Sequence, residues 1–414
     1  MPQKLVLFGP VKCPKSCVIR DFLERNGVPF QWIEITCSDD AQRFVGLESE
    51  SSDRLPALLV AGNILYSPTL MDIAAAIGSS VRPALAEYDV AIVGAGPAGL
   101  SAAVYGASEG LRTVLIERFA IGGQASSTSR IENYLGFPQG LSGVELASRA
   151  REQAVRFGAE ILLASECVDG MISDGRINII LKDGQSVVTR AVICATGVAY
   201  GRLNLLHEEK FIGRGLYYGA GSGEANLCSG HVFVIGGGNS AGQAALHLAS
   251  RARKVTMLVR GDSLKATLSN YLIDRIRVSP NIVVRTHTEL IRIDGDTSLE
   301  RITYRNLDTK EELTAETGWV FICVGGKPQT KWTGSSSDVA RDAAGYMLTD
   351  TDLLQGKNAP LQWSGERNPY PMETSIPGIF AAGDLRATSI KRCATAVGEG
   401  AMAIASVHRF LTTG

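Results

Sequence analysis

The chain has 414 residues and a formal charge of −1, because 41 lysines and arginines balance 42 aspartates and glutamates. This balance provides no basic field for nucleic acid, and a composition of 45% hydrophobic and 20% charged residues excludes wholesale disorder. We expect no membrane partner, because no segment reaches the roughly 18 apolar residues that span a bilayer. The N-terminus lacks a signal-peptide pattern and most cysteines stand singly in apolar runs, so we expect a cytoplasmic, reduced protein. The five histidines show no metal-ligand spacing, and we expect no metal site.

Residues 1–80 alternate short apolar runs with helical segments, which is typical of a small α/β domain. The helix should place Ile19, Phe22 and Leu23 inward, and a hairpin should turn at Gly62-Asn63. Residues 81–87 form the predicted linker. In chain order we expect a strand over 4–8, a helix over Cys17–Asn26, a strand over Phe30–Ile35, a hairpin over 55–66 and a helix over 69–78.

From Tyr88 the sequence changes to a buried strand, a glycine turn, a helix and a second strand. The turn reads Gly94-x-Gly96-Pro97-Ala98-Gly99, and Glu117 ends the second strand. In such a fingerprint the first glycine permits the turn, the second admits a pyrophosphate, and the third lets the helix pack on the sheet. The terminal acid binds a ribose hydroxyl. This unit therefore predicts a dinucleotide site.

The same plan recurs from His231, with Gly236-Gly237-Gly238-Asn239-Ser240-Ala241 at its turn. Its second strand ends at Arg260, with Lys265 nearby, where the first unit has an acid. A cation there suits a 2′-phosphate and favours NADP over NAD, unless Arg260 is only a solvated charge. Two adenine dinucleotides in one chain imply a flavin beside a nicotinamide.

Residues 88–410 resemble the low-molecular-weight thioredoxin reductases through the segments GAGPAGLSAA, IGGQ, IENYLG, ATG, GGGNSA, SIPGIFAAGD and KRCATAVGEG. The resemblance implies an α/β fold of two Rossmann-like three-layer domains. An FAD domain over 88–205 and 329–414 would be interrupted by an NADPH domain over 206–328. It also implies a homodimer in which the two domains rotate relative to each other. The FAD residues that it implies are Gly94, Gly96, Pro97, Ala98, Gly99, Glu117, Gly122, Gly123, Gln124, Asn133, Thr196, Gly197, Gly383, Asp384, Arg392, Cys393 and Ala394. The NADPH residues are Gly236, Gly238, Asn239, Ser240 and Arg260.

The chain departs from this family at its redox disulfide. In the stretch that begins Gly213-Arg214-Gly215, the two cysteine positions read Gly219 and Ser222. Cys228 follows alone and is interpreted as a core residue. Closer likeness exists to a bacterial subgroup of thioredoxin reductase-like flavoproteins that lack the C-x-x-C and often carry an N-terminal thioredoxin-like domain.

Residues 1–80 resemble a glutaredoxin or thioredoxin fold. Cys13 matches the nucleophilic cysteine, Ser16 the resolving position, and Leu55-Pro56 the cis-proline of that fold. A helix N-terminus favours a thiolate. Two alternatives remain open. In one, Cys13 is a nucleophile resolved by Cys17 or an external thiol; in the other, the domain is a degenerate docking or dimerisation module.

The resulting hypothesis is an enzyme that passes hydride from NADPH to FAD and then electrons to an acceptor other than an internal C-x-x-C. The acceptor is Cys13, a disulfide of a thioredoxin- or glutaredoxin-type partner, or a small molecule or redox protein in space left by Gly219–Ser222. Tyr217 and Tyr218 either line that space or are plain core residues. The alternatives are a redox- or nucleotide-sensing scaffold and a ferredoxin- or flavodoxin-type reductase. Residues 353–372, with Trp363, are interpreted as a surface excursion.

Overall fold

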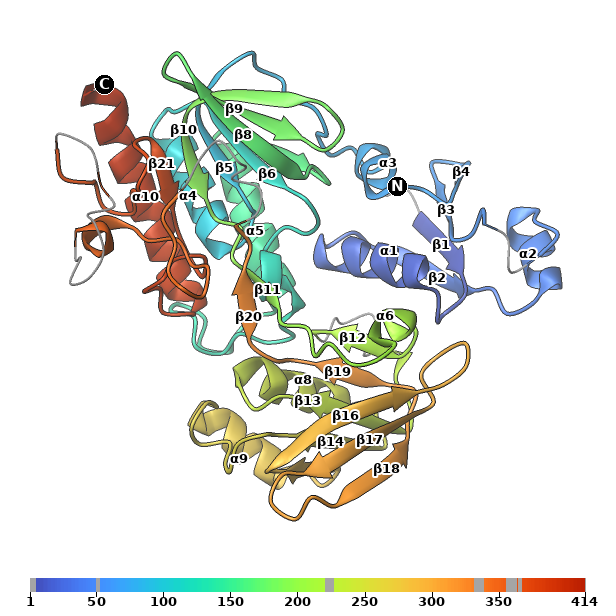
Figure 1. Cartoon of the computed structure of the whole chain (residues 1–414). Helices are drawn as coiled ribbons and strands as arrows, with labels where there is room; N and C mark the ends of the chain where they lie inside the picture. The colour runs from blue at the N-terminus through green and yellow to red at the C-terminus, as the bar shows by residue number, and fades with distance from the viewer. Residues whose placement is uncertain are drawn as a thin grey trace. The chain divides into compact units, whose positions relative to one another are not determined.

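The computed structural model describes residues 5–49, 53–219, 227–330, 339–354, 363 and 367–413. The chain divides into two compact units (Figure 1). The first unit contains residues 1–68, 127–130 and 200–326, and the second contains residues 69–126, 131–199 and 327–414.

The N-terminal part of the first unit is a four-stranded sheet with the order β2-β1-β3-β4, in which β1 pairs parallel with β2 and antiparallel with β3. The Leu55-Pro56 peptide bond before β3 is cis, as the resemblance implies. This sheet and the helices associated with it in sequence are β1 (Leu5–Gly9), α1 (Pro14–Arg25), β2 (Phe30–Glu34), α2 (Ser38–Val45), β3 (Ala57–Val60), β4 (Asn63–Tyr66) and, within the second unit, α3 (Leu70–Ala76).

Two local predictions in this part are wrong by a few residues. Helix α1 begins at Pro14 rather than Cys17, because proline suits the first helical turn and Cys13 takes the N-cap position. Cys17 therefore lies inside the helix. The β3–β4 loop is Ala61-Gly62 rather than Gly62-Asn63, since Val60 pairs with Asn63 and both loop residues have positive φ. The inward positions Ile19, Phe22 and Leu23 are buried as predicted.

The rest of the first unit is built on a parallel five-stranded sheet with the order β12-β19-β13-β14-β15. Helices α8 and α9 cover one face, and an antiparallel three-stranded sheet, β16-β17-β18, covers the other (Figure 1). This gives the three layers expected. The elements are α6 (Glu208–Phe211), β12 (Leu216–Tyr218), β13 (His231–Ile235), α8 (Asn239–Ala249), β14 (Lys254–Leu258), α9 (Asn270–Val278), β15 (Ile282–Arg285), β16 (Thr288–Asp294), β17 (Arg301–Asn306), β18 (Glu312–Glu316) and β19 (Val320–Ile322).

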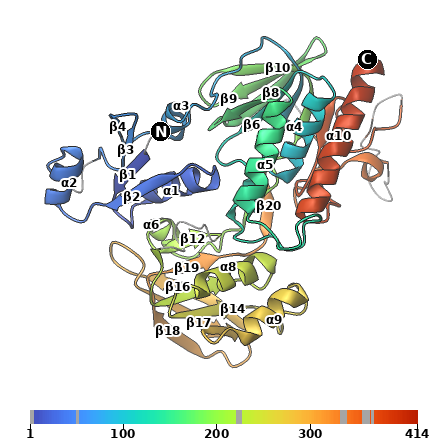
Figure 2. The ribbon, with the colours of Figure 1, turned by 180° about the vertical axis from the view of Figure 1, so that it is seen from behind.

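The second unit is built on a seven-stranded sheet with the order β7-β6-β5-β10-β9-β8, in which β21 also pairs with β10. Helices α4, α5 and α10 lie together on one face (Figure 2). The elements are β5 (Tyr88–Val93), α4 (Pro97–Ser108), β6 (Thr113–Glu117), the 3-10 helix η1 (Gly123–Ser127), α5 (Gly143–Arg156), β7 (Glu160–Leu163), β8 (Cys167–Ser173), β9 (Arg176–Leu181), β10 (Ser186–Cys194), the 3-10 helix η3 (Asp350–Leu353), β21 (Ile379–Ala381) and α10 (Cys393–Thr413).

Two short strands carry the chain from one unit into the other. The second unit gives way to the first within β11 (Val198–Tyr200), and the first to the second within β20 (Gly326–Pro328). These strands pair with each other in a two-stranded sheet. Among the described residues, no helix combines the length and apolar character needed to cross a bilayer.

Candidate dinucleotide-binding sites

The first glycine turn joins β5 to α4 in the second unit. Gly94 has φ of +102°, and a Cβ there would lie 2.5 Å from the Ala195 carbonyl oxygen. A Cβ on Gly99 would lie 1.8 Å from the Gly94 carbonyl oxygen, so this glycine is required by packing. A Cβ on Gly96 would meet no atom within 4 Å. The turn is therefore tightly packed at Gly94 and Gly99, whereas Gly96 has open space where a phosphate would approach.

Helix α4 directs its first backbone N–H groups toward that opening. Its first intrahelical bond runs from Leu100 N–H to the Gly96 carbonyl, so the N–H groups of Ala98 and Gly99 precede the helical ladder. Pro97, the first helical residue, has no N–H to satisfy. The helix N-terminus therefore presents donors and the positive end of its dipole to an anion.

Glu117 is the last residue of β6 and is buried. Its carboxylate accepts the Ala95 N–H at 2.7 Å within the glycine turn, and it accepts the N–H groups of Phe119 at 2.7 Å and Ala120 at 3.2 Å. These bonds fix the acid beside the turn, where the sequence predicts it. The contact with Ala95 is one that sequence reasoning missed.

The segments predicted to complete this site converge on the turn. A Cβ on Gly123 would lie 3.0 Å from the Gly96 Cα, and the Gly122 N–H donates to the Ala95 carbonyl. A Cβ on Gly383 would lie 3.0 Å from the Ala98 Cβ. The structure thus brings together three segments that are far apart in the sequence.

The remaining predicted FAD residues lie around this core. Thr196 donates from its hydroxyl to the Gln329 carbonyl at 2.6 Å, and the Gly197 carbonyl accepts the Gln329 N–H. The Gln124 side chain donates to the Val198 carbonyl. Asn133, Arg392 and Ala394 are exposed, and within the described residues no hydrogen bond joins their side chains to the turn.

Asp384 and Cys393 meet at the start of α10. Burial raises the pKa of the Asp384 carboxyl, and Glu399 adds to this effect while Lys391 opposes it. Burial, with Asp384, also raises the pKa of the Cys393 thiol. The first bond of α10 runs from Ala396 N–H to the Arg392 carbonyl, so the N–H groups of residues 393–395 precede the ladder. The Cys393 thiol and the first N–H groups of α10 therefore lie close enough to Asp384 for its charge to act on the thiol.

Glu399 is a second residue that sequence reasoning missed. Its carboxylate accepts the Gly383 N–H at 2.6 Å, accepts the Ser389 hydroxyl at 2.9 Å and pairs with Arg386 at 3.0 Å. Both ions of this pair are buried. The signal was present in the motif KRCATAVGEG, but nothing in it reveals which loop the glutamate holds.

The second glycine turn joins β13 to α8 in the first unit and repeats this geometry. Gly236 has φ of +136°, and its Cβ would lie 2.4 Å from the Cys323 carbonyl oxygen. A Cβ on Gly238 would meet no atom within 4 Å. The first bond of α8 runs from Gly242 N–H to the Gly238 carbonyl, so the N–H groups of Asn239 and Ser240 precede the ladder.

The loop after β14 lies against the second turn. The Thr267 hydroxyl donates to the Gly237 carbonyl at 2.6 Å, and the Asn239 side chain accepts the Ser269 N–H at 2.8 Å. Arg260 and Lys265 in this loop are exposed, and within the described ranges Arg260 has no ion pair. Two cations on a loop bonded to the turn suit a phosphate group.

All eight cysteines lie within the described residues, and no disulfide joins any two of them. Cys13 and Cys17 are half-buried and are linked by a backbone bond from Cys17 N–H to the Cys13 carbonyl at 2.9 Å. Cys228 is a buried core residue, as predicted.

Of the two interpretations of Tyr217 and Tyr218, the structure supports core packing. Tyr217 is buried and stacks on Trp319 and Phe321, and Tyr218 donates its hydroxyl to Glu208. Gly219 lies against Tyr200, whereas Ser222 is outside the described residues. Much of the 353–372 excursion is also outside them, and Trp363 is half-buried and donates to the Arg367 carbonyl.

Comparison with known proteins agrees with this architecture. Residues 88–400 match the family model described as pyridine nucleotide-disulphide oxidoreductase. A thioredoxin reductase from Treponema pallidum (strain Nichols) is 35% identical over 327 residues, which cover 79% of this chain and 98% of that protein. A bifunctional thioredoxin reductase/thioredoxin from Mycobacterium leprae (strain TN) is 33% identical over 78% of this chain and 66% of that protein. The crystal structure of Lactococcus lactis thioredoxin reductase (FR conformation) superimposes with a TM-score of 0.70 at 31% identity, covering 79% of this chain and 100% of that one.

Members of this family typically bind FAD and use NADPH, and the two open glycine turns fit two such coenzymes. The matched region begins at Tyr88 and so leaves the N-terminal α/β part as an addition. Sequence, fold and site geometry agree, and the chain belongs to the thioredoxin reductase family, as a thioredoxin reductase-like NAD(P)H flavin oxidoreductase.

Proposed function

We propose that this protein oxidises NADPH through bound FAD and reduces an acceptor that is not an internal C-x-x-C. With a disulfide acceptor the reaction is NADPH + H⁺ + RSSR → NADP⁺ + 2 RSH. The observation that carries the proposal is the pair of open glycine turns, at Gly96 and Gly238, each at the start of a helix in its own Rossmann-like sheet.

The second unit is proposed to hold FAD. The N–H groups at the start of α4 would bind its pyrophosphate, and Glu117, already oriented by Ala95, would accept from its ribose. The N-terminus of α10 offers donors to the polar edge of the flavin, beside Asp384 and Cys393. Bound FAD supplies a two-electron relay between the nicotinamide and the acceptor.

The first unit is proposed to hold NADPH. The start of α8 would bind the pyrophosphate, and Arg260 with Lys265 would bind the 2′-phosphate that distinguishes NADPH from NADH. Arg260 is exposed and unpaired within the described residues, so its guanidinium needs no competing ion to be displaced.

The acceptor is proposed to be reached without the family's internal disulfide. No two of the eight cysteines have C-x-x-C spacing, and the expected positions read Gly219 and Ser222. The N-terminal part is proposed to be a thioredoxin- or glutaredoxin-like domain with Cys13 as its nucleophile. The β2-β1-β3-β4 order and the place of Cys13 before α1 support this. The Mycobacterium leprae relative is likewise named for a reductase and a thioredoxin together.

The proposed function also includes an oligomeric state and a partner protein. We propose a homodimer that exchanges electrons with a thioredoxin- or glutaredoxin-type protein or another disulfide. Size-exclusion chromatography with light scattering tests the first, and a panel of protein disulfides and one-electron acceptors tests the second. Turnover of any of them well above the oxygen background would also argue against a purely sensory scaffold.

The decisive experiment is an anaerobic titration of the purified yellow protein with NADPH. We expect the visible flavin absorbance to fall stoichiometrically, and a Gly238→Ala variant, whose new methyl group occupies the phosphate approach, to require far more NADPH. If excess NADPH leaves the flavin absorbance unchanged, or if the protein takes up no FAD, the proposed function is wrong.

A further inference from the structure

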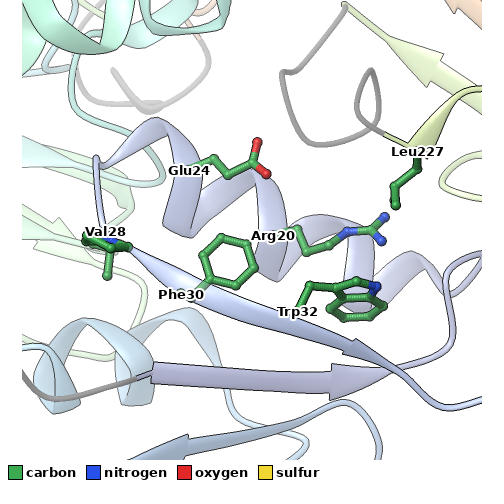
Figure 3. A pocket seen from close by; sticks show the side chains of 7 residues that line it. Arg20, Glu24, Val28, Phe30, Trp32 and Leu227 are labelled. Carbon is green, nitrogen blue, oxygen red and sulfur yellow. The ribbon is translucent and has the colours of Figure 1, made fainter. Parts of the chain in front are cut away.

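A pocket of about 380 Å³ lies in the first unit, and no residue of either glycine turn lines it (Figure 3). This volume is within the range of small-molecule sites. Most of its wall is apolar or aromatic, and one arginine and one glutamate also face it. Its lining residues are Arg20, Glu24, Val28, Pro29, Phe30, Trp32 and Leu227.

The local sequence explains why these side chains meet. Arg20 and Glu24 are four residues apart on α1 and therefore project from one side of the helix. Phe30 and Trp32 are two residues apart on β2 and therefore share one face of the sheet. Leu227 approaches from the nucleotide-binding part of the same unit.

Arg20 is an unusual residue for such a wall. It is only 2% exposed, yet no carboxylate pairs with it in the described parts of the chain. Within the described residues, its buried Nε and Nη1 atoms have no hydrogen-bond partner, and its Nη2 reaches the Val11 carbonyl only at 3.4 Å. A buried guanidinium with two unused donors is costly unless an acceptor satisfies it.

In the described part of the chain, Arg20 makes one other interaction, and it uses neither of those donors. Its guanidinium carbon lies 4.7 Å from the centre of the Trp32 ring, so the cation is attracted to the ring face. This attraction satisfies no N–H donor. Figure 3 shows the guanidinium between Trp32 and Leu227, with Phe30 and Val28 farther along the pocket.

We propose that this pocket binds a small carboxylate with a flat apolar body, such as an aromatic acid. The carboxylate would accept from the unused Arg20 donors, which are charge-assisted and therefore strong. The apolar body would pack on Phe30, Val28 and Pro29. Glu24 on the same wall disfavours a second negative charge, so a monoanion fits better than a phosphate dianion.

The test uses the full-length FAD-loaded protein and 4-fluorobenzoate, with binding followed by ¹⁹F NMR line broadening. We expect saturable binding, with 4-fluorobenzamide, which has the same shape without the charge, at least tenfold weaker. Arg20→Gln should weaken binding of the benzoate at least tenfold. Arg43→Gln removes the same charge from an exposed position on α2 and should leave binding unchanged.

A second variant keeps the proposal testable if loss of Arg20 unfolds the domain. Val28→Trp retains the arginine and fills the cavity, so it should abolish binding while circular dichroism shows an intact fold. Binding is measured without NADPH, so the result does not depend on the proposed reductase activity. Equal affinity for benzoate and benzamide, unchanged binding in Arg20→Gln or in folded Val28→Trp, or no saturable binding at millimolar probe would each overturn the proposal.

Discussion

The glycines of a turn have different structural roles, and alanine substitutions distinguish these roles. Gly96→Ala adds a methyl group where no protein atom lies within 4 Å, at an ordinary φ of −69°. We expect the thermal stability of the FAD-free protein to stay nearly unchanged and FAD affinity to fall at least tenfold.

Gly99→Ala is the matched control, because its methyl group would lie 1.8 Å from the Gly94 carbonyl oxygen. Overpacking of this kind costs about 1–3 kcal/mol or more. We therefore expect Gly99→Ala to lower the melting temperature of the FAD-free protein itself. Differential scanning calorimetry and FAD titration measure both quantities, and equal destabilisation by both variants would contradict the assignment.

The Asp384 carboxyl is predicted to weaken the FAD-free fold at neutral pH. Its pKa is raised above the ordinary 3.8, chiefly by burial, so the folded state binds its proton more tightly than the unfolded state does. Its contribution to stability is therefore present at acid pH and is lost as pH rises through the folded-state pKa.

We expect Asp384→Asn to raise the melting temperature at pH 7.5, with a gain that shrinks as pH falls toward 3.8. Circular dichroism melts of the FAD-free protein across this range measure it. Asp262→Asn, at an exposed position, should show no such trend. A lower melting temperature of Asp384→Asn at pH 7.5 would refute this account.

At the level of elements, α10 holds the loop after β21 through one buried ion pair. Glu399→Gln removes one of the two carboxylates that pair with Arg386 and weakens the bond to the Gly383 N–H. Arg386 keeps its ion pair with Asp350 at 3.2 Å, so the expected cost is that of a buried hydrogen bond to a charged group, about 1.5–3 kcal/mol. We expect a corresponding loss in the free energy of unfolding, measured by urea denaturation. Glu145→Gln breaks an exposed pair with Arg149 and should change little. Similar losses in the two variants would show that burial is not the reason.

The elements also show what the sequence predicts well and what it does not. The strand–glycine–helix units were predictable, because glycine spacing and apolar runs act locally. The start of α1 was misplaced because Cys13, not a usual capping residue, precedes Pro14. Two contacts join chain segments that meet only in the folded protein, so no local pattern reveals them. They are the hydrogen bond from the Gly383 N–H to Glu399 and the stacking of Tyr217 on Trp319.

At the scale of the whole molecule, the proposed path of electrons ends at Cys13 in the N-terminal part. Cys13 and Cys37 each occupy a helix N-cap, of α1 and α2 respectively, so they form a matched pair. If Cys13 is the nucleophile, Cys13→Ser should slow NADPH-dependent reduction of the disulfide of dithionitrobenzoate severalfold, while NADPH still bleaches the flavin. Cys37→Ser should leave the rate unchanged. Equal rates in all three proteins would remove Cys13 from the path.

The two open glycine turns, at Gly96 and Gly238, lie in different units. Substitutions can therefore change the space beside one turn without changing the structure of the other turn. Substitutions near Arg260 alone can therefore change the preferred pyridine nucleotide without altering the proposed FAD site.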